Sequence, residues 1–340
     1  VEDEPLVYLQ ILDKSDGRWR ARNALPGTEG EVLFVDFRHL SGDGATDLLV
    51  GWREPDRDFD TLYLYRYREG SLTEEFHVSC DGVAIGDFTG DGAEELICAT
   101  LDGGVTLQLI GWGGTGISVL DSAYSSLRLQ TITGSVTGRI EEALPGAAFS
   151  GRINAEMSAS LLVGVQSGRL VLPQEDTFTG YSETYCYSGA SPADINNDGI
   201  VEVPWSNAVP GISTGSREDT RYFTEYRALQ NGSYTTIAAC YQNTTDGWRF
   251  ILPPALYDQY WMDALTRQAE TREVVFLQYT GHLNENGREY LRLRVTAGNE
   301  TAPEGYTLLN SRGQFSYYAS IPLGSPLSMA EVEQNFSLLG

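Results

Sequence analysis

A short acidic loop pattern recurs along the chain, and it narrows the fold more than any other feature. "DFTGDGAEEL", from Asp87, and "DINNDGIVEV", from Asp194, each carry oxygen-bearing side chains at positions 1, 3, 5 and 9 and a glycine at position 6. "HLSGDGATDL", from His39, keeps positions 3, 5 and 9, and "RINAEMSASL", from Arg152, is a degenerate fourth copy. The copies recur roughly every 50 residues, which is the range of propeller blades.

The segments between the loops read as short strands separated by turn residues. "DLLVGW", "TLYLYRYREG", "SLTEEFHVS" and "GVAIGDF" follow the first loop in this order. "LVYLQILDKSDGRWRARN" near the N-terminus and "YFTEYRALQNGSYTTIAACY" after the last loop each read as two further strands. The pattern predicts a mainly β fold, a β-propeller of four-stranded antiparallel blades that is partial or has few blades.

The pattern changes near Thr244, which predicts a boundary between residues 1–243, the propeller repeats, and residues 244–340, a small α+β domain. Ser328 and Glu331 have the spacing of a capping box, so a short helix is expected at the C-terminal end. Aromatic residues of this region are expected in its core: Trp248, Phe250, Tyr257, Tyr260 and Trp261.

The loop spacing suits Ca²⁺, which takes six to eight oxygen ligands in an adaptable geometry. In the Asp87 loop the candidate ligands are Asp87, Thr89, Asp91, the carbonyl of Ala93, and Glu95. In the Asp194 loop they are Asp194, Asn196, Asp198, the carbonyl of Ile200, and Glu202. The His39 loop retains Ser41, Asp43 and Asp47 and is a weaker candidate, while Arg152 puts a positive charge where the first ligand of its loop belongs.

Two alternatives compete with the calcium interpretation. An EF-hand requires a bidentate Glu at position 12, where this chain has Cys98 and Trp205, so that motif is excluded. The loops can also be metal-free turns, because Asp and Asn bond their own backbone and tolerate unusual φ angles.

These loops resemble the FG-GAP/VCBS repeats of integrin-alpha-like propellers, over roughly residues 1–240. The resemblance implies loops between the first two strands of each blade, Ca²⁺ bound by the side chains named above, and an extracytoplasmic location. The C-terminal "GWRFILP" is similar to domains that follow such repeats in secreted lipoproteins of gut Firmicutes and, weakly, to the PsbP/Mog1 fold.

Charge and cysteine usage limit the function classes. The formal net charge of −24 opposes binding to nucleic acid. No apolar run approaches the length of a membrane span, and "VEDEPLVY" lacks the features of a signal peptide, so the protein is either cytosolic or carries a leader outside this chain. Four widely separated cysteines form no CxxC pair; they are expected in the core, and up to two disulfides stay open: Cys80, Cys98, Cys186 and Cys240.

No catalytic constellation emerges from the sequence. "GISTG" (211–215) and "GWGGTG" (111–116) match nucleophile-elbow and dinucleotide motifs but lack the flanking helices that these require. The leading hypothesis is a non-catalytic, extracytoplasmic protein that presents a surface to a glycan, peptide or protein partner. The alternatives are a hydrolase or lyase with paired carboxylates at the propeller mouth, acting on polysaccharide or lipid, and a module of an envelope assembly.

Overall fold

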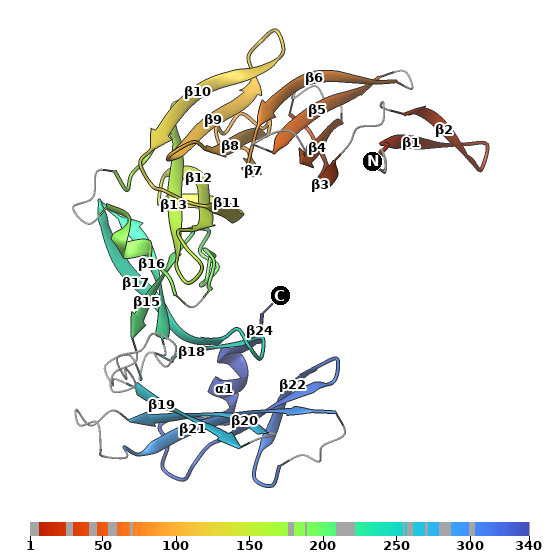
Figure 1. Cartoon of the computed structure of the whole chain (residues 1–340). Helices are drawn as coiled ribbons and strands as arrows, with labels where there is room; N and C mark the ends of the chain where they lie inside the picture. The colour runs from red at the N-terminus through yellow and green to blue at the C-terminus, as the bar shows by residue number, and fades with distance from the viewer. Residues whose placement is uncertain are drawn as a thin grey trace, which may run out of the picture. The chain divides into compact units, whose positions relative to one another are not determined.

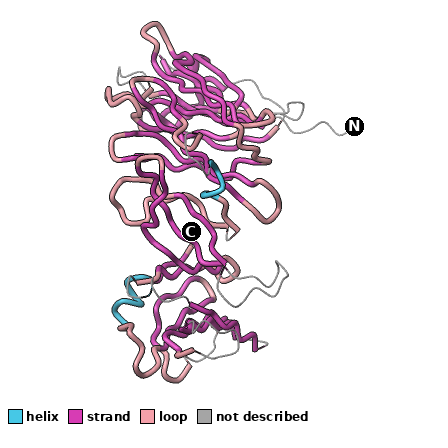
Figure 2. Tube along the Cα trace, turned by 90° about the vertical axis from the view of Figure 1, so that its left-hand side faces the viewer, coloured by secondary structure: helices cyan, strands magenta, loops and turns pink. Residues whose placement is uncertain are grey.

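The structure is a computed structural model of the chain (Figure 1). It describes residues 7–24, 30–40, 46–53, 60–68, 71–175, 180–187, 189–208, 222–253, 256, 261–268, 271–278, 287–298 and 303–339. Over these residues the protein is mainly β, as predicted, and several of its antiparallel sheets have four strands (Figure 2). None of the described helices is long and apolar enough to cross a membrane.

The chain forms two compact units. The first comprises Val1–Tyr185, Ser191–Val203 and Ala228–Thr235, and the second comprises Cys186–Ala190, Pro204–Arg227 and Thr236–Gly340. The boundary predicted at residue 244 falls inside the last of these segments and stays a prediction.

The first unit contains a hairpin and three four-stranded sheets, each of which follows the chain order. The hairpin is β1 (Gln10–Ser15) and β2 (Arg18–Ala24). The first sheet is β3 (Glu31–Arg38), β4 (Asp47–Arg53), β5 (Thr61–Arg68) and β6 (Ser71–Ser79). The second is β7 (Gly82–Gly86), β8 (Glu95–Leu101), β9 (Val105–Trp112) and β10 (Ile117–Ser125). The third is β11 (Thr131–Glu141), β12 (Leu144–Arg152), β13 (Ser158–Gln166) and β14 (Arg169–Val171), and the 3₁₀ helix η1 (Gly180–Thr184) follows it.

The middle strands of these sheets are buried on both faces, which explains their continuous apolar sequences. β4 and β13 are each buried over six or more consecutive residues. The second and third sheets share one core, in which Phe88, Leu107 and Phe149 are fully enclosed. Burial of this kind, at about 25 cal/mol per Å² of apolar surface, is the main favourable contribution to folding.

Close contact between β7 and β11 joins the second sheet to the third. The hydroxyls of Ser135 and Thr137 on β11 donate to the carbonyls of Val83 and Ile85 on β7, at 2.7 and 3.1 Å. A Cβ at Gly82 would lie 2.6 Å from the Ile132 side chain, so a larger residue at this position would force Ile132 to shift.

Two five-stranded sheets and the α-helix account for most of the described part of the second unit, although Val203 and Ala228–Thr235 at the ends of three strands belong to the first unit. One sheet has the order β15 (Val203–Ala208), β16 (Tyr222–Gln230), β17 (Ser233–Asn243), β18 (Trp248–Ile251) and β24 (Phe336–Leu338). The other has the order β19 (Trp261–Gln268), β20 (Thr271–Gln278), β21 (Glu289–Ala297), β23 (Phe315–Ser320) and β22 (Thr307–Arg312). The helix α1 (Met329–Asn335) begins with the predicted capping box of Ser328 and Glu331.

The aromatic core predicted for this region is confirmed for Trp248 and Phe250. Trp248 and Phe250 are fully buried in a cluster that also contains Phe276 and Tyr317. Trp261 lies in β19, and the predicted core residues Tyr257 and Tyr260 lie outside the described residues.

The structure describes one of the two segments that match the nucleophile-elbow and dinucleotide motifs. "GWGGTG" comprises the last two residues of β9 and the turn to β10, in which Gly113 N donates to Gly116 O at 2.8 Å, so it does not open a helix. "GISTG" lies outside the described residues.

Candidate functional site

The Asp87 loop lies between β7 and β8, the first two strands of its sheet, which is the place that the resemblance to FG-GAP/VCBS repeats implies. Asp87 organises its tip: Oδ1 accepts from the backbone N of Gly90 and Asp91 at 2.7 and 3.1 Å, and Oδ2 accepts from Gly92 N at 3.1 Å. Asp91 Oδ1 accepts from Ala93 N at 2.8 Å. The loop is therefore closed by carboxylates bonding to its own backbone.

Glu95 closes the same loop from the start of β8. It is almost fully buried; its Oε2 accepts from the backbone N of Phe88 and Thr89 at 2.8 and 3.1 Å, and its Oε1 accepts from Thr89 Oγ1 at 2.9 Å. Burial raises the pKa of the Glu95 carboxyl, and the nearby charge of Asp91 adds to this effect.

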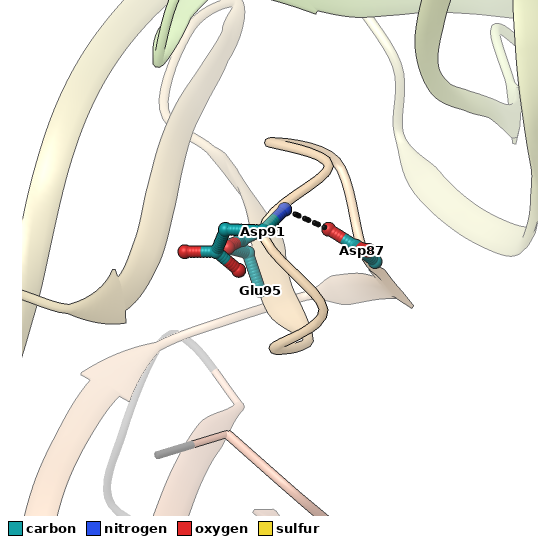
Figure 3. Close-up of side chains that lie close together, drawn as sticks. All are labelled: Asp87, Asp91 and Glu95. Carbon is teal, nitrogen blue, oxygen red and sulfur yellow. Dashed lines mark hydrogen bonds between the residues drawn. The ribbon is translucent and has the colours of Figure 1, made fainter. Parts of the chain in front are cut away.

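Asp87, Asp91 and Glu95 converge in space (Figure 3). Each contributes one carboxylate oxygen to a group whose members all lie within 4.8 Å of one another. A carboxylate has about four acceptor positions, so the bonds to the loop backbone leave lone pairs free for a cation. The donor set is all oxygen, which fits Ca²⁺ or another hard cation.

The Asp194 loop repeats this architecture in front of β15. Asp194 accepts from the backbone N of Asp198 at 3.0 Å and of Gly199 at 2.8 Å. Asp198 Oδ1 accepts from Ile200 N at 2.7 Å, and Asn196 Oδ1 accepts from Asp198 N at 3.1 Å.

Glu202 differs from Glu95 in having one oxygen without a partner. Its side chain is fully buried; Oε2 accepts from Ile195 N at 2.9 Å, and Oε1 has no hydrogen-bond partner among the described residues. Burial, with smaller contributions from the charges of Asp198 and Asp194, raises the pKa of Glu202 to about 7. A bound cation would reverse this penalty, because it favours the ionised carboxylate.

An arginine also faces the Asp194 loop. The Arg139 guanidinium donates to the backbone carbonyl of Asp198. Hydrogen bonds from Ile200 and Asn196 lower the pKa of the Asp198 carboxyl, and the charge of Arg139 adds to this. Asp198 is therefore ionised at neutral pH, as a metal ligand must be.

Asp47 in the His39 loop is occupied by an ion pair. Its Oδ1 accepts from Arg66 Nε at 2.9 Å and its Oδ2 from Leu40 N at 3.0 Å, with both charged side chains buried. Ser41 and Asp43 lie outside the described residues. Arg66 already neutralises the carboxylate at position 9, which makes this loop a poorer cation site than the other two.

The three acidic loops share one contact that sequence reasoning missed. In each, the carboxylate at position 9 accepts a hydrogen bond from the backbone N at position 2, which is Leu40, Phe88 or Ile195. The acidic residue that recurs at position 9 is the sequence feature from which this hydrogen bond could have been predicted. This contact closes the turn without an ion, so the turn and metal interpretations are compatible.

The Arg152 copy occupies a different place from its relatives. It lies between β12 and β13, the second and third strands of its sheet, whereas the resemblance implied the first two. Asn154 Oδ1 accepts from the backbone N of Glu156 and Met157, both at 2.9 Å, and closes the turn. Position 9 is Ser160, which has no carboxylate, and the backbone N of Ile153 at position 2 donates instead to the carbonyl of Met157 at 2.8 Å.

A cavity of about 390 Å³ in the first unit brings together residues that the sequence did not connect; its lining includes Phe34, Arg53, Asp60, Cys80, Asp81 and Ser135. Asp60 accepts from Arg53 Nε and Nη2, both at 3.0 Å, and Asp81 Oδ2 accepts from Leu101 N at 2.7 Å. Burial raises the pKa of the Asp81 carboxyl, and the charge of Asp60 contributes. These residues are far apart in the sequence, so no short sequence motif predicts the cavity.

Comparison with known proteins gives only distant structural likenesses. No family model and no curated protein matches the chain. It is similar to Sqt1 of Saccharomyces cerevisiae, with 12% identity, a TM-score of 0.40 and coverage of 79% of this chain and 75% of that one. It is also similar to the rhamnogalacturonan lyase YesW, with 12% identity, a TM-score of 0.37 and coverage of 82% of this chain and 65% of the lyase.

Proposed function

We propose that this chain is a non-catalytic, extracytoplasmic binding protein, an FG-GAP/VCBS-type propeller whose strand-connecting loops hold structural Ca²⁺. The observation that carries the proposal is that Asp87, Asp91 and Glu95 each place one carboxylate oxygen within 4.8 Å of the other two. The unpartnered Oε1 of Glu202 supports the same role for the Asp194 loop. The propeller architecture and the location outside the cytoplasm are parts of the proposal that rest on the resemblance to FG-GAP/VCBS repeats.

A partner-binding role is supported by exposed aromatic side chains on the sheets of the first unit. Phe37 on β3 is 66% exposed, and Tyr124 on β10 is 57% exposed. Aromatic groups in such positions are typical anchors for protein or glycan partners. The strongly negative net charge disfavours nucleic acid as that partner.

Calorimetric titration with Ca²⁺ tests the metal sites. We expect heat of binding for the wild-type chain, a weaker signal for Asp91→Asn and for Asp198→Asn, and no signal for the double variant, because each substitution removes a charged ligand. The matched control is Asp102→Asn, an exposed aspartate in the turn after β8, which should titrate like the wild type. Absence of heat at millimolar Ca²⁺, or an unchanged isotherm in the double variant, would contradict the sites.

The second candidate function is a hydrolase or lyase, and the cavity with Asp60 and Asp81 favours it. Two carboxylates in one cavity, one with a raised pKa, are the groups that acid–base catalysis on a polysaccharide uses. The test is release of new chain ends from a panel of acidic and neutral polysaccharides. Turnover that disappears in Asp81→Asn would establish this alternative, and equal turnover in wild type and variant would remove it.

A further inference from the structure

Arg249 and Ser337 carry two unpartnered polar atoms on one sheet of the second unit. The residues stand directly opposite each other on β18 and β24, so their side chains lie on the same face with Cβ atoms about 5 Å apart. Arg249 Nε and Ser337 Oγ are both buried, and neither has a hydrogen-bond partner among the described residues. A buried polar group without a partner is destabilising unless a ligand or a water molecule satisfies it.

The face that carries this pair is opposite to the aromatic core. Trp248 and Phe250, on either side of Arg249, are fully buried in that core, and the residues on either side of Ser337 also pack against it. Because side chains alternate along a strand, Arg249 and Ser337 point to the other face. Both residues are partly exposed, so the two buried atoms lie close to the surface.

The phenol of Tyr226 on β16 lies against the same guanidinium. Arg249 Nη1 donates to Tyr226 Oη at 3.4 Å, and the guanidinium carbon is 5.9 Å from the centroid of the phenol ring. Tyr226 is 2% exposed, and its own hydroxyl proton has no acceptor among the described residues. Burial holds the pKa of Tyr226 above its ordinary value, so the phenol keeps this proton at neutral pH. The group therefore contains three donors without an acceptor: Arg249 Nε–H, the Ser337 hydroxyl and the Tyr226 hydroxyl.

Arg249 also has no carboxylate partner within the described part of the chain. Its neighbours in the strand register are Gln242 on β17 and Ser337 on β24, and neither is acidic. Arg294 provides the contrast, because its Nε is likewise buried and unpartnered but Glu273 stands directly opposite it on β20. A buried positive charge is normally paired, so Arg249 lacks an anion that the chain itself does not supply.

We propose that Arg249, Ser337 and Tyr226 form a binding site for the carboxylate group of a small organic acid. The planar guanidinium matches a carboxylate in shape and charge, and the two hydroxyls donate to its remaining lone pairs. One positive charge balances a monoanion, whereas a phosphate dianion would leave excess negative charge in a protein whose net charge is −24.

Titration of the ¹⁵N-labelled full chain with sodium acetate, against sodium chloride at the same ionic strength, tests the site by NMR. The Arg249 Nε–H signal, identified by its absence in Arg249→Lys, should shift saturably with acetate and not with chloride. The Arg294 Nε–H signal is the matched control and should not move. Ser337→Ala and Tyr226→Phe should each need about tenfold more acetate for half-saturation, because each loses a hydrogen bond to a charged group.

Three outcomes would overturn the proposal. One is an Arg249 signal that does not respond saturably at tens of millimolar acetate, or that responds equally to chloride. Another is a titration of Ser337→Ala and Tyr226→Phe that matches the wild type, and the third is tighter binding of inorganic phosphate than of acetate. The wild-type titration decides the question even where a variant folds poorly, and it does not depend on Ca²⁺ or on the proposed partner.

Discussion

Replacement of Arg66 by methionine is expected to lower the free energy of unfolding by about 3–5 kcal/mol, the effect of leaving a buried charge uncompensated. Asp47 and Arg66 stand directly opposite each other in the β4–β5 register, and their side chains are 0% and 1% exposed. Without the guanidinium, the Asp47 carboxylate would keep the single backbone donor from Leu40. The Arg66 guanidinium also lies 5.4 Å from the ring centroid of Trp112, a contact that would be lost as well.

Urea denaturation of the purified variant measures this effect, and Arg53→Met is the matched control. Arg53 also pairs with an aspartate, at 3.0 Å from Asp60, but it is 57% exposed, so its loss should change stability by no more than about 1 kcal/mol. The double variant Asp47→Asn/Arg66→Met should recover part of the loss, because it removes both charges. An Arg66→Met variant as stable as Arg53→Met would contradict a large stabilising contribution from the buried Asp47–Arg66 ion pair.

Glu202→Gln is expected to stabilise the calcium-free protein at pH 8, by about 3 kcal/mol for a carboxyl whose pKa rises on folding from 4.5 to about 7. The direction of this stability change follows from the coupling between proton binding and folding. Below pH 4.5 the carboxyl is protonated in both states, and no penalty exists. Between the two values the unfolded chain has ionised while the folded one holds its proton, so stability falls as pH rises, and the loss is complete above pH 7.

Denaturation in chelator at pH 5 and pH 8 tests this expectation. The wild type should lose stability relative to Glu202→Gln between the two pH values, while Glu142→Gln, at an exposed carboxylate in the β11–β12 turn, should follow the wild type. A glutamine variant that is less stable than the wild type at pH 8 in chelator would contradict the claim that ionisation of the buried Glu202 destabilises the folded protein. In Ca²⁺ the order should reverse, because the cation stabilises the ionised Glu202 and glutamine cannot replace its charge.

The sequence predicted the features that local spacing determines. The strand-rich class, the turn at Asp87 and the capping box at Ser328 all depend on residues within a few positions of one another. Such features form through contacts between near neighbours in the sequence. In the Asp87 loop, for example, a glycine at position 6 and a hydrogen-bond acceptor at position 1 define the turn without any contact to a distant strand.

The missed features depend on pairing between distant segments. Arg66 reaches Asp47 only through the β4–β5 register, which a shift of one residue would have changed. Arg139 reaches the Asp194 loop through a bridge between Arg139 and Ile200. The carboxylates of the cavity likewise come together through the packing of the sheets, which cannot be predicted from a single sequence.

Thermal unfolding with and without Ca²⁺ tests most directly the proposal that the ion stabilises the folded loops. A ligand that binds only the folded state adds about 2.7 kcal/mol at a hundred times its Kd, which raises the midpoint by several degrees. We predict a higher midpoint in Ca²⁺ than in chelator for the wild type, and no difference for Asp91→Asn/Asp198→Asn. A wild-type midpoint that is the same in millimolar Ca²⁺ and in chelator would contradict the account.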